Sequence, residues 1–126
     1  MKEEVTEVYE KEEDINRLCE KLRAIQFDDL IKTEHFEYSI DEKGTDLAEI
    51  KENFRKFEKV KMINQRRHAS GKISYDFYYE LEDGTYLIYA LILEEKPLLI
   101  NAFHVSRSFK SFKKHLMKAY KDSLIG

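Results

Sequence analysis

Basic, imidazole and hydroxyl side chains gather at two places in this sequence where they could support proton transfer next to a phosphate. His35 follows Thr33, which can cap a short helix, so the imidazole is expected in a first helical turn, where free N–H groups attract anions. A second group lies in the basic stretch 65–72, which contains Arg66, Arg67, His68, Ser70 and Lys72. Histidine exchanges protons near neutral pH, and arginine matches two phosphate oxygens. These residue types suit metal-free RNA cleavage, in which a 2′-hydroxyl attacks the adjacent phosphorus with the help of a base, an acid and cations.

Other common chemistries lack their motifs. The chain has four His and one Cys, with no Cys-x-x-Cys and no His-Glu-x-x-His spacing, so we expect no zinc site. It also has no glycine-rich phosphate loop and no Gly-x-Ser-x-Gly nucleophile elbow. Cys19 falls on an apolar helix face and is interpreted as a small core residue. No metal and no cofactor are therefore expected.

The elements that would position these side chains centre on an antiparallel meander over residues 73–105. Its three strand-like runs are 73–81, 85–93 and 98–105. The first run alternates apolar and polar residues, and the second is apolar on both faces, as in a central strand. Asp83-Gly84 fits a tight hairpin turn between them. Pro97 precedes the third run, where no ladder N–H is needed.

Helical patterns flank this meander on both sides. Apolar residues at 15, 18, 19, 22 and 25 predict an N-terminal helix over about residues 5–26. A short helix starting at Glu34 is expected to end at Gly44, and Asp46 with Glu49 forms a capping-box start for the next helix. That helix should bury the stripe Leu47, Ile50, Phe54 and Phe57.

Residues 60–63 are expected to form a short strand before the basic stretch, and a terminal helix should follow Ser106-Arg107-Ser108. Its residues Phe109, Phe112, Leu116 and Ala119/Tyr120 should face inward. The whole is predicted to be one α+β domain over residues 1–126: an N-terminal helix over 1–26, a core over 30–106 with an antiparallel sheet of about four strands and one or two short helices, and a basic C-terminal helix over 107–126.

Cysteine usage and hydropathy bear on location. Cys19 is the only cysteine, so an internal disulfide is excluded and a reducing cytoplasm is the natural compartment. No apolar run is long enough for a membrane span, and no leader pattern is visible. We therefore expect a cytoplasmic protein without a membrane partner.

Charge divides the chain into two unlike halves. Residues 1–58 hold ten Lys/Arg and eighteen Asp/Glu, giving −8, whereas residues 59–126 hold twelve and seven, giving +5. The two halves sum to the net charge of −3. A basic half favours nucleic acid, and Arg107, Lys110 and Lys114 on the terminal helix are candidates for RNA contact. The same cations also complement the helix dipole, which is a purely structural alternative.

The order of these segments resembles a known group of proteins. Ile31-Lys32-Thr33-Glu34-His35-Phe36, leading to Ser39 and Lys43-Gly44, is followed by a capped helix, a basic turn and a three-stranded meander. This order looks like that of small RelE-like toxin domains, within the wider barnase–EndoU–colicin–RelE ribonuclease fold group. The resemblance covers about residues 30–106 and rests on the pattern of segments.

The resemblance implies a metal-independent endoribonuclease that cleaves RNA through 2′-hydroxyl attack. By its motifs, His35 is the helix-start histidine and acts as base or acid. Arg66, Arg67 or Lys72 supplies the cation on the sheet, and Ser106 supplies the hydroxyl of the last strand. The implied catalytic set is His35, Lys72 and Ser106, and the implied RNA-binding set is Arg66, Arg67, His104, Arg107, Lys110 and Lys114. RNA, free or on the ribosome, and an antitoxin protein are the implied partners.

Two other functions fit the same residues. A non-catalytic interaction module could use the acidic N-terminal helix to bind a basic protein or to form a homodimer. A small-ligand domain could use the tyrosine-rich sheet, where Tyr75, Tyr78, Tyr79, Tyr86 and Tyr89 serve either stacking or core packing. His104 also fits a hydrogen-bonded core histidine at a strand end, and Lys72 fits a strand-edge lysine that blocks edge pairing.

Overall fold

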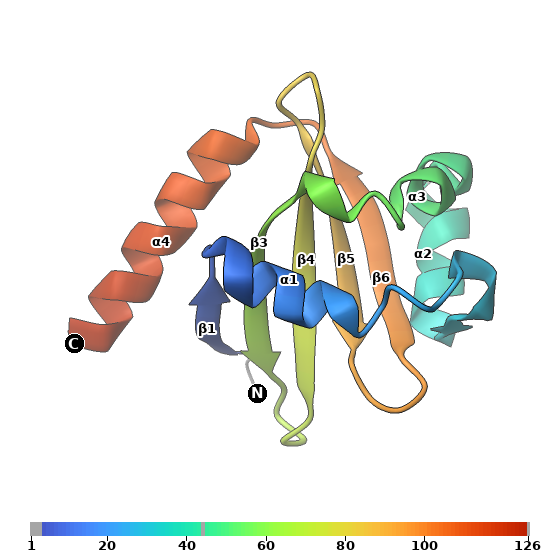
Figure 1. The fold of residues 1–126 in the computed structure, drawn as a ribbon, viewed down its shortest axis with the longest axis horizontal. Helices are drawn as coiled ribbons and strands as arrows, with labels where there is room; N and C mark the ends of the chain where they lie inside the picture. Colours follow the sequence, from blue (N-terminus) through green and yellow to red (C-terminus); the bar gives the residue numbers. More distant parts are fainter. Residues whose placement is uncertain (1–3, 44, 126) are drawn as a thin grey trace.

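The computed structural model describes residues 4–43 and 45–125, and it has an α+β fold with a six-stranded sheet (Figure 1). The strands are β1 Glu4–Tyr9, β2 Ile31–Lys32, β3 Val60–Arg67, β4 Ile73–Glu80, β5 Tyr86–Ile92 and β6 Leu98–Val105. The α-helices are α1 Glu12–Glu20, α2 Glu34–Lys43, α3 Leu47–Asn53 and α4 Phe109–Ile125, with 3₁₀ turns η1 Phe27–Asp29 and η2 Phe57–Lys59. The α+β class and the antiparallel meander are confirmed.

The sheet order is β1-β3-β4-β5-β6-β2. The four central strands form the meander in chain order, and Gly84 takes a φ of +86° in the turn between β4 and β5, as an Asp-Gly turn requires. Two further strands from the first third of the chain occupy the edges. β1 pairs antiparallel with β3, and β2 pairs parallel with β6. These edge strands explain why the sheet exceeds the expected four strands.

The prediction of a helix from residue 5 was wrong at its start. Residues 4–9 form strand β1, and the helix α1 spans only Glu12–Glu20. Val5, Val8 and Tyr9 are β-branched or aromatic, and pairing with β3 decides their conformation. The interpretation of Ile15, Leu18 and Cys19 as core residues is confirmed, because all three are buried.

Caps predicted from the sequence set the helix starts. Thr33 Oγ1 accepts from the Phe36 N–H at 3.2 Å, and Asp46 Oδ1 accepts from the Glu49 N–H at 3.2 Å. Ser108 Oγ accepts from the Ser111 N–H at 3.3 Å at the start of α4. The predicted end at Gly44 lies outside the described residues. Leu47 was wrongly assigned to the buried stripe, because it is 44% exposed at the first position of α3, whereas Ile50 and Phe54 are fully buried.

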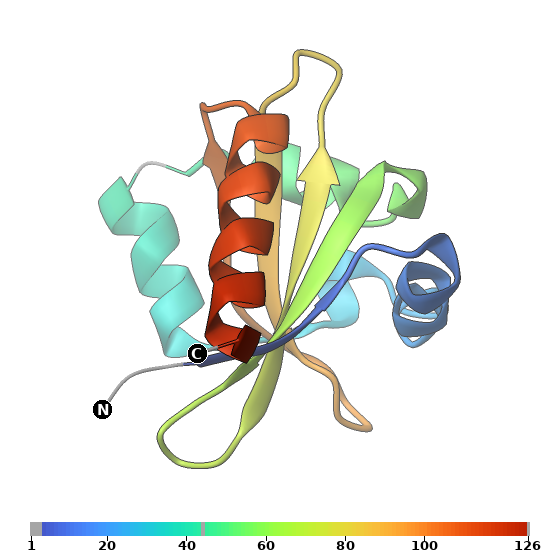
Figure 2. The same ribbon diagram turned by 90° about the vertical axis from the view of Figure 1, so that its left-hand side faces the viewer.

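The two faces of the sheet are covered differently. On one face, α1, α3 and both 3₁₀ turns cover a large core that includes Phe54, Phe77, Tyr79 and Tyr89. On the other face, α4 packs over a smaller cluster of Met62, Tyr78, Tyr86 and Phe109. Figure 2 shows α4 crossing the sheet on the side away from α1, with α2 beside it at the margin. We call the first the α1 face and the second the α4 face.

Ala119 was expected to face inward but is exposed, while Phe112 and Leu116 of α4 pack against the smaller cluster as predicted. The first two turns of α4 are placed by a direct backbone link, since the Phe109 N–H donates to the Gly84 carbonyl at 2.8 Å. Among the described helices, none is both long and apolar enough to cross a membrane.

Candidate functional site

A hollow of about 370 Å³ opens on the α4 face between α2 and α4. Its polar lining is His35, Arg66, His68, Ser74, Asp76, Tyr78 and Asn101, and its apolar lining is Ile88, Ala90, Ile100, Phe103 and Phe112. The size falls at the lower end of the range for small-molecule sites, roughly 300–1,000 Å³. A larger hollow of about 530 Å³ lies beside α1 and η2, but it has no histidine in its lining. We therefore take the α4-face hollow as the candidate site.

Strand register explains how these side chains meet. Asn64 lies opposite Asp76, Asp76 opposite Ala90, and Ala90 opposite Asn101, so one row crosses four strands. Side chains directly opposite each other point to the same face of a sheet. The short side chain of Ala90 sits in the middle of this row between longer polar neighbours. The depression in the sheet surface follows from that difference in length.

Asp76 anchors a polar network at the floor of the hollow. Its Oδ2 accepts from Asn64 Nδ2 at 3.0 Å, from Arg66 Nε at 3.1 Å and from Arg66 Nη2 at 2.7 Å. The Asp76 side chain is only 7% exposed, whereas that of Arg66 is 30% exposed. The carboxylate therefore fixes a guanidinium that still reaches the surface of the hollow.

Tyr78 completes this network from the next position of β4. Its hydroxyl donates to Asn64 Oδ1 at 2.6 Å. Burial, reinforced by the nearby Asp76 carboxylate, raises the pKa of Tyr78 well above its ordinary value, so it remains a neutral donor. The amide of Asn64 is thus held at both ends, and its nitrogen is directed at Asp76.

His68 stands at the rim, just beyond the end of β3. Its Nε2 lies 2.7 Å from Ser74 Oγ, and Ser74 is fully buried. The turn that carries it is closed by a bond from the His68 N–H to the Lys72 carbonyl at 2.9 Å and by Gly71 at a φ of +90°. The imidazole therefore has a defined position beside a hydroxyl and near Arg66.

His35 reaches the same hollow from the opposite side. It is exposed in the first turn of α2, and α2 packs against β6. Thr33 ties the helix start to the sheet, because its hydroxyl donates to the Ile100 carbonyl at 3.2 Å while capping the helix. Two imidazoles from distant segments, His35 and His68, thus line one hollow together with Arg66.

Two members of the catalytic set predicted from the resemblance lie elsewhere. Lys72 lines a separate hollow with Gln65, Tyr75 and Leu93. Ser106 is exposed just beyond the end of β6 and is outside the lining of the α4-face hollow. Arg67 is exposed, and it alternates with Arg66 along β3, so it points to the other face. His35 and Arg66 are brought together, and Lys72 and Ser106 are not.

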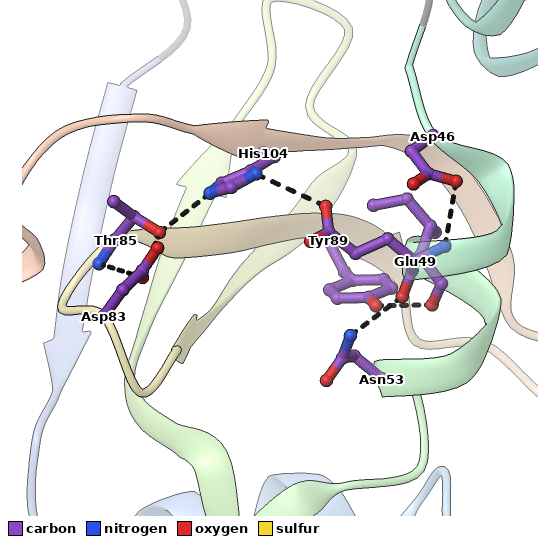
Figure 3. A network of polar contacts seen from close by, with 8 residues as sticks. Asp46, Glu49, Asn53, Asp83, Thr85, Tyr89 and His104 are labelled. Carbon is purple, nitrogen blue, oxygen red and sulfur yellow. Dashed lines mark hydrogen bonds and ion pairs between the residues drawn. The ribbon is translucent and has the colours of Figure 1, made fainter.

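His104 belongs to a different network on the α1 face (Figure 3). Its Nδ1 lies 3.3 Å from Glu49 Oε1 on α3, and its Nε2 lies 2.8 Å from Thr85 Oγ1. Thr85 in turn donates to Asp83 Oδ1 at 2.6 Å, and this bond is the main cause that lowers the pKa of Asp83. His104 therefore links α3 to the β4–β5 turn and is neither a core histidine nor a neighbour of the hollow.

The cations predicted to bind RNA on α4 are exposed. Arg107, Lys110 and Lys114 all have solvent-accessible side chains on or just before this helix. Lys113 instead pairs with Glu10 at 3.5 Å, which ties α4 to the end of β1. Among the described residues, no three His, Cys, Asp or Glu side chains are grouped closely enough to hold a metal ion.

Residues that the sequence-based assignment left out complete the site. Ser74, Asp76 and Asn101 line the hollow, and none of the three was predicted to be a site residue. A signal was present, because polar side chains recur at positions 64 and 66 and again at 74 and 76, with the period of a strand. A buried polar stripe of that kind needs partners on the neighbouring strand.

Comparison with known proteins gives no relative: no protein-family model, no curated protein and no solved structure matches this chain.

Proposed function

We propose that this protein is a metal-independent endoribonuclease of the RelE-like toxin type, with its active site in the α4-face hollow. The observation that carries the proposal is the meeting of two imidazoles and a guanidinium, from His35, His68 and Arg66, in one hollow on an antiparallel sheet. Acid–base cleavage of RNA needs two proton-transfer groups and a cation at one place. The order of segments supports the same class of activity.

The reaction would proceed by attack of the ribose 2′-oxygen on the adjacent phosphorus. One imidazole takes the proton of the 2′-hydroxyl, and the other gives a proton to the 5′-oxygen as the P–O5′ bond breaks. The products are a 2′,3′-cyclic phosphate and a free 5′-hydroxyl. Arg66, held by Asp76, would balance the negative charge that develops on the phosphoryl oxygens. His68 and Arg66 thereby take the place of Lys72 and Ser106 in the catalytic set.

The exposed cations of α4 would guide the RNA strand to the hollow. Lys110 and Lys114 lie on α4, which borders the site, and Arg107 lies just before this helix. Each phosphate neutralised on a single strand contributes about −0.7 to the slope of log affinity against log salt. RNA affinity should therefore fall steeply with added salt, and less steeply in a variant with Lys110 and Lys114 changed to Gln.

Cellular context is part of the proposal. A cytoplasmic toxin would meet messenger or ribosome-bound RNA and would need an antitoxin protein. Cys19 fits a reducing compartment because it has no second cysteine to pair with. Its thiol is buried, and burial raises its pKa to about 11, which makes it a poor nucleophile.

The test is cleavage of a labelled single-stranded RNA by the purified chain in the presence of EDTA. His35→Ala and His68→Ala should each slow cleavage by about 10²- to 10⁴-fold, the usual contribution of a general acid or base. The matched control is His115→Ala, an exposed histidine of α4 outside the lining of the hollow. RNA that stays intact with the unmodified protein would remove the proposal, as would equal rates in all three variants.

A steric variant tests the location without touching a titratable group. Ala90→Leu would place a larger side chain in the middle of the depression, so cleavage should be lost while the far-UV circular dichroism spectrum is kept. Cleavage at the original rate would show that the reaction occurs elsewhere on the molecule.

The second candidate function, a protein-binding module, would have to use the exposed acidic surface of α1 and not its apolar face. The apolar residues of α1 are buried in the core, so a homodimer through that helix face would have to unpack it. The outward acids, including Glu12 and Glu13, are exposed and available for a basic partner or a second copy. If the RNA stays intact, we propose that this acidic surface is the functional one, and pull-down with a basic peptide that fails in Glu12→Gln/Glu13→Gln would support it.

A further inference from the structure

Asn101 presents a single kind of hydrogen-bonding group to the hollow. It lies on β6 opposite Ala90, and its Oδ1 accepts from the Ala102 N–H at 2.9 Å. Because that bond needs an acceptor, the oxygen and nitrogen of the amide cannot be exchanged. Among the residues that the structure describes, the amide nitrogen has no hydrogen-bond acceptor. The NH₂ group is therefore a donor left for a ligand.

The surroundings of this donor suit a flat, largely apolar ring. Ile88 and Ala90 form the middle of the depression, and Phe103 and Phe112 border it. The ring centroids of Phe112 and Tyr78 are 5.3 Å apart, so the two rings pack against each other. Unpaired nucleobases stack on aromatic rings of this kind and are then read by a few polar groups at their edges.

Two acceptors elsewhere in the hollow already have partners. Asp76 Oδ2 accepts from Asn64 and Arg66, and Ser74 Oγ lies 2.7 Å from His68 Nε2. A base that brings an exocyclic amino group to Asn101 would place a donor against a donor. A base with a carbonyl oxygen in that place would accept from Asn101 instead.

We propose that the hollow selects an unpaired keto base, uracil or guanine, over the amino bases cytosine and adenine, with the Asn101 amide as the reading group. Uracil O4 and guanine O6 occupy the positions that carry amino groups in cytosine and adenine. This inference rests on the proposed function, since it takes RNA as the ligand and names which nucleotide sits next to the reacting phosphate. Asn101 is a specificity-determining residue in this scheme.

The experiment measures binding of four nucleoside 3′-monophosphates to the full chain by NMR titration. Uridine 3′-monophosphate should bind about five- to tenfold tighter than cytidine 3′-monophosphate. This ratio corresponds to one hydrogen bond that uracil forms with Asn101 and cytosine cannot form. Guanosine should exceed adenosine 3′-monophosphate similarly. Asn101→Asp keeps the acceptor for the Ala102 N–H and replaces the donor, so it should reverse the order. Asn16→Asp makes the same chemical change at an exposed position of α1, away from the α4-face hollow, and should leave the order of affinities unchanged.

The outcomes separate this inference from the proposed function. RNA that is cut while the four nucleotides bind equally would overturn the inference alone. A keto preference that Asn101→Asp reverses, with RNA left intact, would support the inference and remove the nuclease. A keto preference that Asn101→Asp leaves unchanged would overturn the role of Asn101.

Discussion

Buried polar groups find different hydrogen-bond partners on the two faces of the sheet. On the α1 face, tyrosine hydroxyls end on backbone carbonyls: Tyr79 donates to the Phe54 carbonyl at 2.6 Å, and Tyr89 donates to the Ile50 carbonyl at 2.5 Å. On the α4 face, polar side chains bond to one another around Asp76. The first arrangement locks helices onto the sheet, and the second leaves a hollow with charged walls.

This difference indicates which face is built for packing and which for binding. A hydroxyl tied to backbone satisfies its partner and offers nothing to a ligand. A network of side chains fixes charged groups at a surface that a helix does not close. The same strand supplies both, since Tyr79 and Tyr78 are neighbours on β4 and point to opposite faces.

The largest expected effects come from breaking each face at its centre. Phe54→Ala should cost about 3–5 kcal/mol of unfolding free energy, because it opens a cavity beneath a fully buried ring. Asp76→Ala should cost about 2–3 kcal/mol for another reason, since it leaves the buried Asn64 amide without its acceptor and the partly exposed Arg66 guanidinium without its carboxylate. Urea unfolding with a fluorescence or circular dichroism signal measures both.

A double variant distinguishes the two causes. Adding Arg66→Met to Asp76→Ala removes the uncompensated charge, so part of the lost stability should return. Adding it to Phe54→Ala should give no recovery. Equal behaviour of the two pairs would contradict the distinction between the faces.

The neighbouring tyrosines give an intermediate effect. Tyr79→Phe should cost about 1–3 kcal/mol, because the buried Phe54 carbonyl loses its donor and water cannot replace it. Tyr78→Phe should also cost about 1–3 kcal/mol, because Asn64 is fully buried and its Oδ1 would lose the hydroxyl donor. A loss well below about 1 kcal/mol in Tyr78→Phe alone would show that water reaches Asn64 on the α4 face, whereas it cannot reach the Phe54 carbonyl on the α1 face.

Alkaline pH should weaken the fold through buried groups on the α1 face. Burial raises the pKa of Cys19 from 9.0 to about 11 and raises that of Tyr79 well above 10.0. A raised pKa means that the folded state keeps the proton longer than the unfolded state, so stability is full below pH 9 and falls as the pH rises towards 11. Urea unfolding between pH 8 and 11 should show this decline, and Cys19→Ala should make it shallower between pH 9 and 11. A flat profile in the unmodified chain would contradict the assignment.

The smallest effect is expected at the histidine of the α1 face. His104→Ala removes a contact between two partly exposed side chains and should cost about 1 kcal/mol or less. It should leave RNA cleavage unchanged, in contrast to His68→Ala. A large loss of cleavage in His104→Ala would place the reaction on the wrong face for the α4-face hollow.

Local signals in the sequence were sufficient for the meander and the caps. The alternation in β4, the turn at Asp83-Gly84 and the caps at Thr33, Asp46 and Ser108 depend on residues close in the chain. The edge strand β1 could not be predicted in this way, because its conformation depends on pairing with β3. The prediction that Leu47 is buried was wrong for a related reason. Helical spacing shows which residues share a face, but it does not show how far the neighbouring elements cover that face.

The site was only half visible in the sequence. The helix cap at Thr33 and the basic stretch pointed to His35 and Arg66, which share the hollow. The residues around His104 do not predict its contact with α3. That contact depends on which face of the sheet His104 takes in β6 and on the position of Glu49. The role of Asp76 likewise depends on register, which places it opposite Asn64 and within reach of Arg66.

From the strand order we also expect a definite order of events during folding. The meander from β3 to β6 can assemble by successive hairpins between neighbours in the chain, while β1 and β2 must wait for it before they can add to its two edges. On a translating ribosome, β1 is made before the strand it pairs with and is therefore expected to be among the last strands to find its partner. Amide hydrogen exchange should accordingly be fastest in β1 and β2 and slowest in β4 and β5, with the hollow carried on the most persistent part of the molecule.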